Sequence, residues 1–140
     1  LFERAFTGFI HPSYSNLDRP TRLVLLHASE ASLKRCPYCI ETAARIAGLM
    51  HAEGSHDLAL EMLEHYARQL LEMIPKDRYV HVDYGFLDNR PFHRLMHAYV
   101  LLLHEVGRND DARKIAESMV ALHPNDNIGF RFLIEGQNKE

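Results

Sequence analysis

The residues best suited to carry out chemistry form the segment Cys36–Cys39, whose sequence is CPYC. Two thiols separated by two residues suit thiol–disulfide exchange, half of a zinc site, or an ordinary turn before a helix. A structural zinc ion needs four ligands, and the chain has no second C-x-x-C pair. His27 and His51 flank the segment at spacings that match no zinc pattern. We favour the turn, with Pro37 starting a helix and at least one cysteine packed as a small apolar side chain.

The same tetrapeptide in glutaredoxins joins a strand to a helix, whose N-terminus lowers the pKa of the first thiol. Thiol–disulfide oxidoreductase-like activity at Cys36 and Cys39 is therefore one alternative function. That activity needs a thioredoxin-like fold with further strands. Residues 20–35 and those after Ala43 instead have the apolar spacing of helices, which counts against this alternative.

Histidine-mediated metal binding is a second alternative, because the chain contains ten histidines. His93, His97 and His104 share one stripe of a predicted helix, since steps of four and eleven residues rotate by only about 40° and 20°. His93 and His97 are spaced to chelate one ion. The neighbouring stripe is apolar and includes Phe92 and Leu95, so we favour a position for these histidines at the border of the buried face or in a groove.

The composition indicates one globular domain covering residues 1–140. Apolar residues make up 46% and charged residues 25%, as in soluble proteins. The net charge of −3, the pI near 6.4 and the scattered basic residues predict no nucleic-acid partner. No apolar run reaches 18 residues, so we expect no membrane span. The two cysteines and the lack of a signal-peptide pattern at the start predict a cytoplasmic protein. We expect no cofactor.

Apolar residues recur at helical spacing over most of the chain. The clearest window is Phe92–Val106, which Gly107 ends. A second helix begins near Asn109–Asp111, where polar and acidic side chains suit a helix start, and it ends before Pro124. Together these signals predict a helical hairpin over about residues 92–123.

An earlier hairpin, over about residues 37–74, follows the same plan, with Gly54 at its bend. We expect further helices near residues 22–34 and 128–136 and the end of another within residues 1–10, which gives six or seven in all. Residues 75–91 break the pattern with a short period-two alternation that is too short for a sheet. We interpret them as an irregular insertion.

The two hairpins form an internal repeat, because aligning Gly54 on Gly107 also aligns Ala59 on Ala112. The segment His93–Asp126 resembles the tetratricopeptide repeat (TPR) family in its length, its bend glycine, the alanine that follows, and its terminal proline. The resemblance implies an all-α fold of stacked antiparallel hairpins, a TPR-like α-solenoid, in which each hairpin buries its second face against the next. Both alanines are then expected to be buried.

In TPR proteins the first helix of each hairpin lines a concave surface. The resemblance therefore implies a groove that includes Glu41, His51, Arg94, His97, Leu101, His104, Glu105 and Arg131. The basic clamp by which some members hold a terminal carboxylate is missing from the matching positions. The implied function is that of a non-catalytic protein–protein interaction scaffold that binds a peptide or helix of a partner. Because such stacks normally need three repeats, we expect missing residues or a second copy, as in a homo-oligomer, to cover the ends.

Overall fold

The computed structural model describes residues 16–35, 39–74, 81–85, 87–126 and 128–136. These residues form six α-helices and one short 3-10 helix, and they contain no β-strand. In chain order the elements are α3 (Arg19–Arg35), α4 (Ile40–Ala52), α5 (His56–Glu72), η1 (Leu87–Asn89), α6 (Arg90–Glu105), α7 (Asn109–Leu122) and α8 (Phe130–Gly136). The predicted all-α fold is confirmed. The helix expected within residues 1–10 and the first part of the predicted insertion lie outside the described residues.

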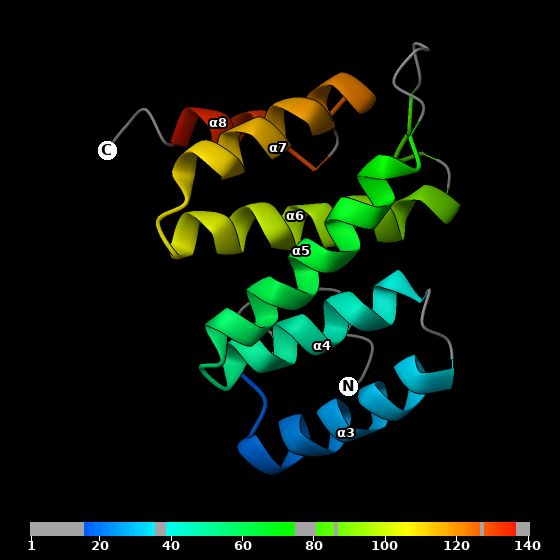
Figure 1. The fold of residues 1–140 in the computed structure, drawn as a ribbon, viewed down its shortest axis with the longest axis vertical. Coiled ribbons are helices and arrows are strands. Elements are labelled where there is room, and N and C mark those ends of the chain that lie inside the picture. Colours follow the sequence, from blue (N-terminus) through cyan, green and yellow to red (C-terminus); the bar gives the residue numbers. More distant parts are fainter. Residues whose placement is uncertain (1–15, 36–38, 75–80, 86, 127, 137–140) are drawn as a thin grey trace.

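The helices pack in series as stacked hairpins (Figure 1). Helix α4 packs against α5, and α6 packs against α7. Helix α6 also contacts both helices of the preceding hairpin, so the two pairs share one core. Helix α3 packs against α4 at one end of the stack, and α8 packs against α7 at the other. Each helix pair thus covers its neighbour, as the repeat pattern predicts.

Alanines line the contacts between the helices. Ala44 and Ala47 of α4, Ala59 of α5 and Ala112 of α7 have no exposed surface. A methyl side chain allows two helix backbones to approach closely, and larger residues fill the space beside the contact. Helix α6 lies at the centre of the core and buries nine residues. The predicted burial of Ala59 and Ala112 is confirmed.

The two hairpin bends have the same structure. Gly54 and Gly107 have φ angles of +84° and +86°, in the left-handed region that favours glycine. After each glycine, the next amide donates a hydrogen bond back over the bend, from Ser55 N to Met50 O and from Arg108 N to Leu103 O, at 2.8 Å in both cases. This is the Schellman arrangement, and it satisfies helix carbonyls that would otherwise lack a donor. The equivalence of the bends supports the internal repeat.

The outer helices are held by polar contacts as well as by packing. Helix α3 buries only Leu25 and Ser29, and its Arg22 binds Glu53 at the end of α4 with an N–O distance of 2.7 Å. Hydrogen bonding to Arg22 lowers the pKa of Glu53. At the other end, the carboxylate of Asp126 accepts hydrogen bonds from the first amides of α8. Among the described helices, none is long and apolar enough to cross a membrane.

The alanine contacts predict that a larger side chain destabilises the fold at some positions of a helix and not at others. Replacing Ala112 with phenylalanine should destabilise the protein by about 1–3 kcal/mol, because the larger ring has no space between α6 and α7. The matched control is Ala121→Phe on the exposed face of the same helix, which should change the free energy of unfolding by less than about 0.5 kcal/mol. Urea unfolding followed by circular dichroism measures both. Equal stabilities for the two variants would contradict the packing described above.

Candidate functional site

The eight predicted groove residues all lie on α4, α6 and α8, the helices that the TPR resemblance assigns to one surface. The structure brings four of them together in two pairs that join α4 to α6. Arg94 Nη1 lies 2.5 Å from Glu41 Oε1, and His51 Nε2 lies 2.6 Å from Glu105 Oε2. The predicted surface therefore contains ion-pairing groups that bind each other.

The Glu41–Arg94 pair reduces the capacity of this surface to bind a charged partner. Burial is the largest single influence on the pKa of Arg94 and lowers it, but the hydrogen bond to Glu41, the charge of that carboxylate and the interaction with Tyr84 together raise the pKa by more, so the net shift is upward. The guanidinium is thus held in its charged form by a carboxylate of the same chain. A partner carboxylate would have to displace Glu41, which costs the existing charge-assisted hydrogen bond.

The remaining groove residues are directed to separate partners. The His97 ring lies 5.8 Å from the ring of Phe130, and His104 Nδ1 lies 3.2 Å from Asn109 Oδ1. Arg131 lies above the Phe132 ring and 3.6 Å from Asp126 Oδ2, and Leu101 is half-buried. The structure places these four residues on the expected helices without gathering them into one cluster.

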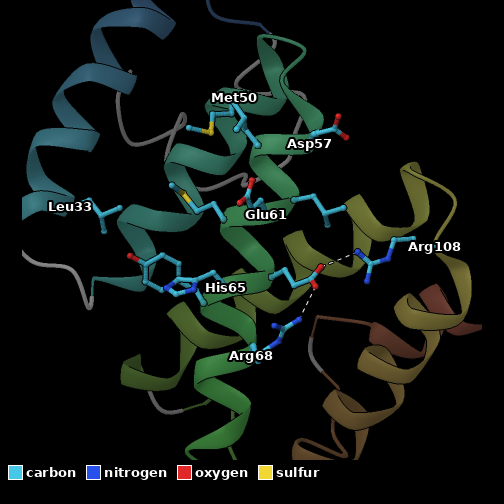
Figure 2. A pocket seen from close by; sticks show the side chains of 12 residues that line it. Leu33, Met50, Asp57, Glu61, His65, Arg68 and Arg108 are labelled. Carbon is cyan, nitrogen blue, oxygen red and sulfur yellow. Dashed lines mark hydrogen bonds and ion pairs between the residues drawn. The ribbon is translucent and has the colours of Figure 1, made fainter.

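A hollow that the sequence did not predict lies over α5 and has a volume of about 780 Å³ (Figure 2). Leu33 of α3 and Met50 of α4 contribute to it, and most of its lining comes from α5. Leu58 and Met62 are apolar members of that lining, and 56% of the Leu58 surface is exposed. The hollow therefore offers apolar side chains that the described part of the fold leaves uncovered.

The periodicity of α5 explains why these side chains remain outside the core. Ala59, Leu63 and Ala67 recur at steps of four and are the residues that α5 buries. Leu58 and Met62 follow the same spacing one position earlier, so they face about 100° away from the buried stripe. Helix α5 thus has more apolar residues than its contacts with α4 and α6 cover.

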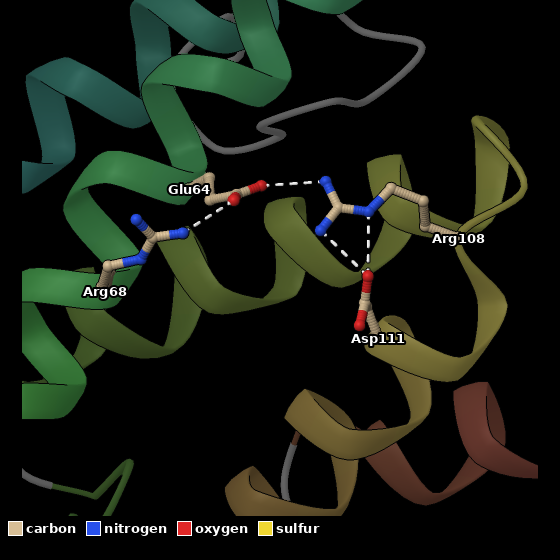
Figure 3. Close-up of polar contacts among 4 residues, drawn as sticks. All are labelled: Glu64, Arg68, Arg108 and Asp111. Carbon is tan, nitrogen blue, oxygen red and sulfur yellow. Dashed lines mark hydrogen bonds and ion pairs between the residues drawn. The ribbon is translucent and has the colours of Figure 1, made fainter.

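The rim of the hollow carries three carboxylates, of Asp57, Glu61 and Glu64, and two arginines, Arg68 and Arg108. Glu64 binds both Arg68 and Arg108, each at 2.9 Å, and Arg108 also binds Asp111 (Figure 3). Hydrogen bonds from Arg108 to Glu64 and Asp111 raise the Arg108 pKa, so both acids hold it in its charged form. Asp57 and Glu61 also line the hollow, and within the described part of the chain neither forms an ion pair. Two carboxylates therefore face solvent beside an apolar floor.

A second hollow of about 540 Å³ continues along α5 from the first. Tyr66 lines both hollows, and the second also includes Ile40, Leu70 and Met73. Met73 is 77% exposed. The uncovered apolar strip thus extends from Leu58 in the first turn of α5 to Met73 just beyond its last residue.

His93, one of the three histidines considered for metal binding, is buried in the structure. Its Nε2 donates a hydrogen bond to the carbonyl of Val82 at 2.5 Å, which leaves Nδ1 as an acceptor with no partner among the described residues. Its ring lies 5.3 Å from the ring of His123. Within the described ranges, His93, His97 and His104 do not form a three-ligand group. The position of His93 fits the favoured interpretation, in which these histidines border the buried face.

Cys39 is disulfide-bonded and directly precedes the first residue of α4. We favoured a turn in which at least one cysteine packs as a small apolar side chain, and the disulfide at Cys39 differs from a free thiol in that role. The other cysteine of the chain, Cys36, lies outside the described residues together with Pro37 and Tyr38. The motif is followed by a helix and preceded by α3, so the flanking elements are those of the predicted inter-helix turn.

Comparisons of the chain with protein-family models, with curated proteins and with solved structures give no match.

Burial of His93 predicts a pH-dependent stability. Burial lowers its pKa below the ordinary value of 6.5, so the unfolded chain takes up a proton at a pH where the folded protein does not. The contribution of neutral His93 to stability is complete above pH 6.5 and is lost as the pH falls toward the lowered pKa. The slope from this one group is at most about 1.4 kcal/mol per pH unit.

The variant His93→Gln removes this titration and keeps a donor for Val82, so its free energy of unfolding should fall less steeply between pH 7 and 5 than that of the wild type. The control His27→Gln changes an exposed histidine and should keep the wild-type slope. Chemical unfolding at a series of pH values measures all three slopes. Parallel curves for wild type and His93→Gln would exclude His93 as the source.

Proposed function

We propose that the protein is a non-catalytic interaction scaffold that binds an amphipathic segment of another protein in the hollow over α5. The feature that carries this proposal is the exposed apolar strip of α5, which is bordered by Asp57 and Glu61, two carboxylates that form no ion pair within the described part of the chain. The TPR resemblance supports it, because proteins of that family present stacked hairpins to peptides or helices of their partners. Membership of the family is part of the proposal and rests on the repeat landmarks quoted above.

The choice of surface follows from the interactions within the chain that each surface would lose when a partner binds. On the α4–α6 side, Glu41, Arg94, His51 and Glu105 already satisfy one another. Over α5, by contrast, apolar side chains face solvent, and covering one leucine completely contributes about 1.5–3 kcal/mol. Binding over α5 therefore gains hydrophobic stabilisation without breaking an existing ion pair. This surface replaces the predicted groove as the favoured binding face.

The chemistry of the rim specifies the partner. Asp57 and Glu61 favour a segment that carries lysine or arginine beside an apolar face, because opposite charges at the rim of a groove steer and orient the partner. A helix with apolar residues at positions i, i+4 and i+7 matches the strip along α5. The proposed ligand is thus a basic amphipathic helix. A second copy of this chain is an alternative occupant.

The cytoplasmic location remains a prediction. The disulfide at Cys39 weighs against it, because stable disulfides are rare in cytosolic proteins. Thiol–disulfide activity at the CPYC motif is not part of the proposal.

A peptide titration tests the proposed surface. A designed helical peptide with leucine on one face and lysine on the other should shift backbone amide signals of α5 and of the facing end of α3. Replacing Leu58 with glutamine should weaken its affinity about tenfold or more, because one buried apolar contact is lost. The matched control is Leu87→Gln, which changes another exposed leucine, 70% exposed against 56% for Leu58, in η1 outside the hollow, and should leave the affinity unchanged.

A further pair of variants separates the two surfaces. The double variant Arg94→Glu with His97→Ala changes the predicted groove and should leave peptide affinity intact. Loss of binding in this variant, with retention in Leu58→Gln, would assign the interaction to the α4–α6 face and contradict the proposed surface. Sedimentation velocity of the wild-type chain without peptide identifies self-association. A dimer that Leu58→Gln dissociates would replace the foreign partner with a second copy.

A further inference from the structure

We infer that His51, His56 and Glu105 form a binding site for one divalent transition-metal ion, with Zn²⁺ as the best match. One ligand atom from each of the three side chains lies within 4.8 Å of the other two. The inference is independent of the proposed function, because it concerns the binding of a metal ion by the chain alone. It also differs from the sequence-based alternative, which placed the metal on His93 and His97.

Three helix ends bring these side chains together. His51 lies in the last turn of α4, His56 is the first residue of α5, and Glu105 is the last residue of α6. The bend between the histidines is fixed by Gly54, whose amide donates to His51 O at 2.9 Å, and by the bond from Ser55 to Met50. The two imidazoles are therefore held by a rigid turn rather than by a flexible loop.

The carboxylate of Glu105 faces both imidazoles. Its Oε2 lies 2.6 Å from His51 Nε2, and its Oε1 lies 3.4 Å from His56 Nδ1. The two rings are 4.5 Å apart between centroids and inclined at 57°. A tetrahedral zinc ion with bonds of about 2.0–2.1 Å separates its ligand atoms by about 3.3 Å. Glu105 Oε1 already lies at about that distance from His56 Nδ1, whereas its Oε2 lies about 0.7 Å closer than that to His51 Nε2, so the carboxylate would have to turn to present one oxygen to the ion.

The donor set indicates the class of metal. Two imidazole nitrogens with one carboxylate oxygen suit Zn²⁺ and neighbouring transition metals, whereas Mg²⁺ and Ca²⁺ prefer oxygen ligands throughout. The side chains of His56 and Glu105 are 37% and 45% exposed, so solvent reaches the site. Three protein ligands leave a fourth position of a tetrahedral ion for water or for a donor from another molecule.

The second hairpin provides an internal comparison. His104 and Asn109 stand 53 residues after His51 and His56, on an equivalent bend, and His104 Nδ1 lies 3.2 Å from Asn109 Oδ1. There the second histidine is replaced by an amide, and in the described part of the chain no three-ligand group includes His104. A simple ion pair between His51 and Glu105 does not need His56. The substitution His56→Asn therefore gives the first hairpin the residue that the second hairpin already has.

Calorimetric titration of the full, metal-free chain with Zn²⁺ tests the site, with the disulfide left oxidised so that thiolates do not compete. We expect one ion per chain and no binding of Mg²⁺ under the same conditions. His56→Asn and Glu105→Gln should each weaken Zn²⁺ affinity by roughly tenfold or more, since even indirect supporting residues of metal sites have effects of that size. The control His104→Asn should keep the wild-type affinity.

Circular dichroism of each variant separates loss of a ligand from loss of the fold. If Glu105→Gln unfolds the chain, His56→Asn carries the test, because Asn109 occupies the equivalent place in a folded hairpin. Absence of Zn²⁺ binding, an affinity that His56→Asn leaves unchanged, or an equal loss in His104→Asn would overturn the inference. Several weak ions per chain, insensitive to His56→Asn, would also overturn it as adventitious binding to surface histidines.

Discussion

The close approach of helices at alanine contacts is the constraint on which the rest of the structure depends. Ala47, Ala59 and Ala112 have no exposed surface, and each occupies a place where a larger side chain would push two helices apart. Because these contacts bring α6 against both α4 and α5, two hairpins share one core. The same packing determines which polar side chains form ion pairs between neighbouring helices and which side chains remain exposed.

The elements of the fold could be predicted because their signals are local. Helical periodicity, the glycines at the bends and the alanines after them identify both hairpins within a few residues of their observed ends. Even the Glu41–Arg94 pair has a sequence signal, because the two residues are 53 positions apart, the offset of the internal repeat. Equivalent positions on adjacent first helices lie side by side. The sequence assigned both residues to one surface but did not show that they bind each other.

The hollow over α5 could not be predicted in the same way, because it depends on what the neighbouring helices leave uncovered. Leu58 and Leu63 are the same residue type on one helix, yet Leu63 is fully buried and Leu58 is largely exposed. The packing of α4 and α6 against α5 decides which leucine is covered. The cluster of His51, His56 and Glu105 also depends on tertiary structure, since α6 brings Glu105 to a bend that lies about 50 residues earlier in the chain. A cluster whose side chains come from two repeats can be identified only when the stacking of those repeats is known.

Solvent access at the methionine methyl groups tests the central claim most directly, namely that stacking buries one face of α5 and leaves the other uncovered. Paramagnetic relaxation of these methyl signals by a soluble, neutral probe can be measured on the unmodified protein. The account predicts strong relaxation of Met73, intermediate relaxation of Met62, and protection of Met96 and Met119 in the core. Protection of Met62 and Met73 equal to that of Met96, at a concentration where the chain is monomeric, would contradict it.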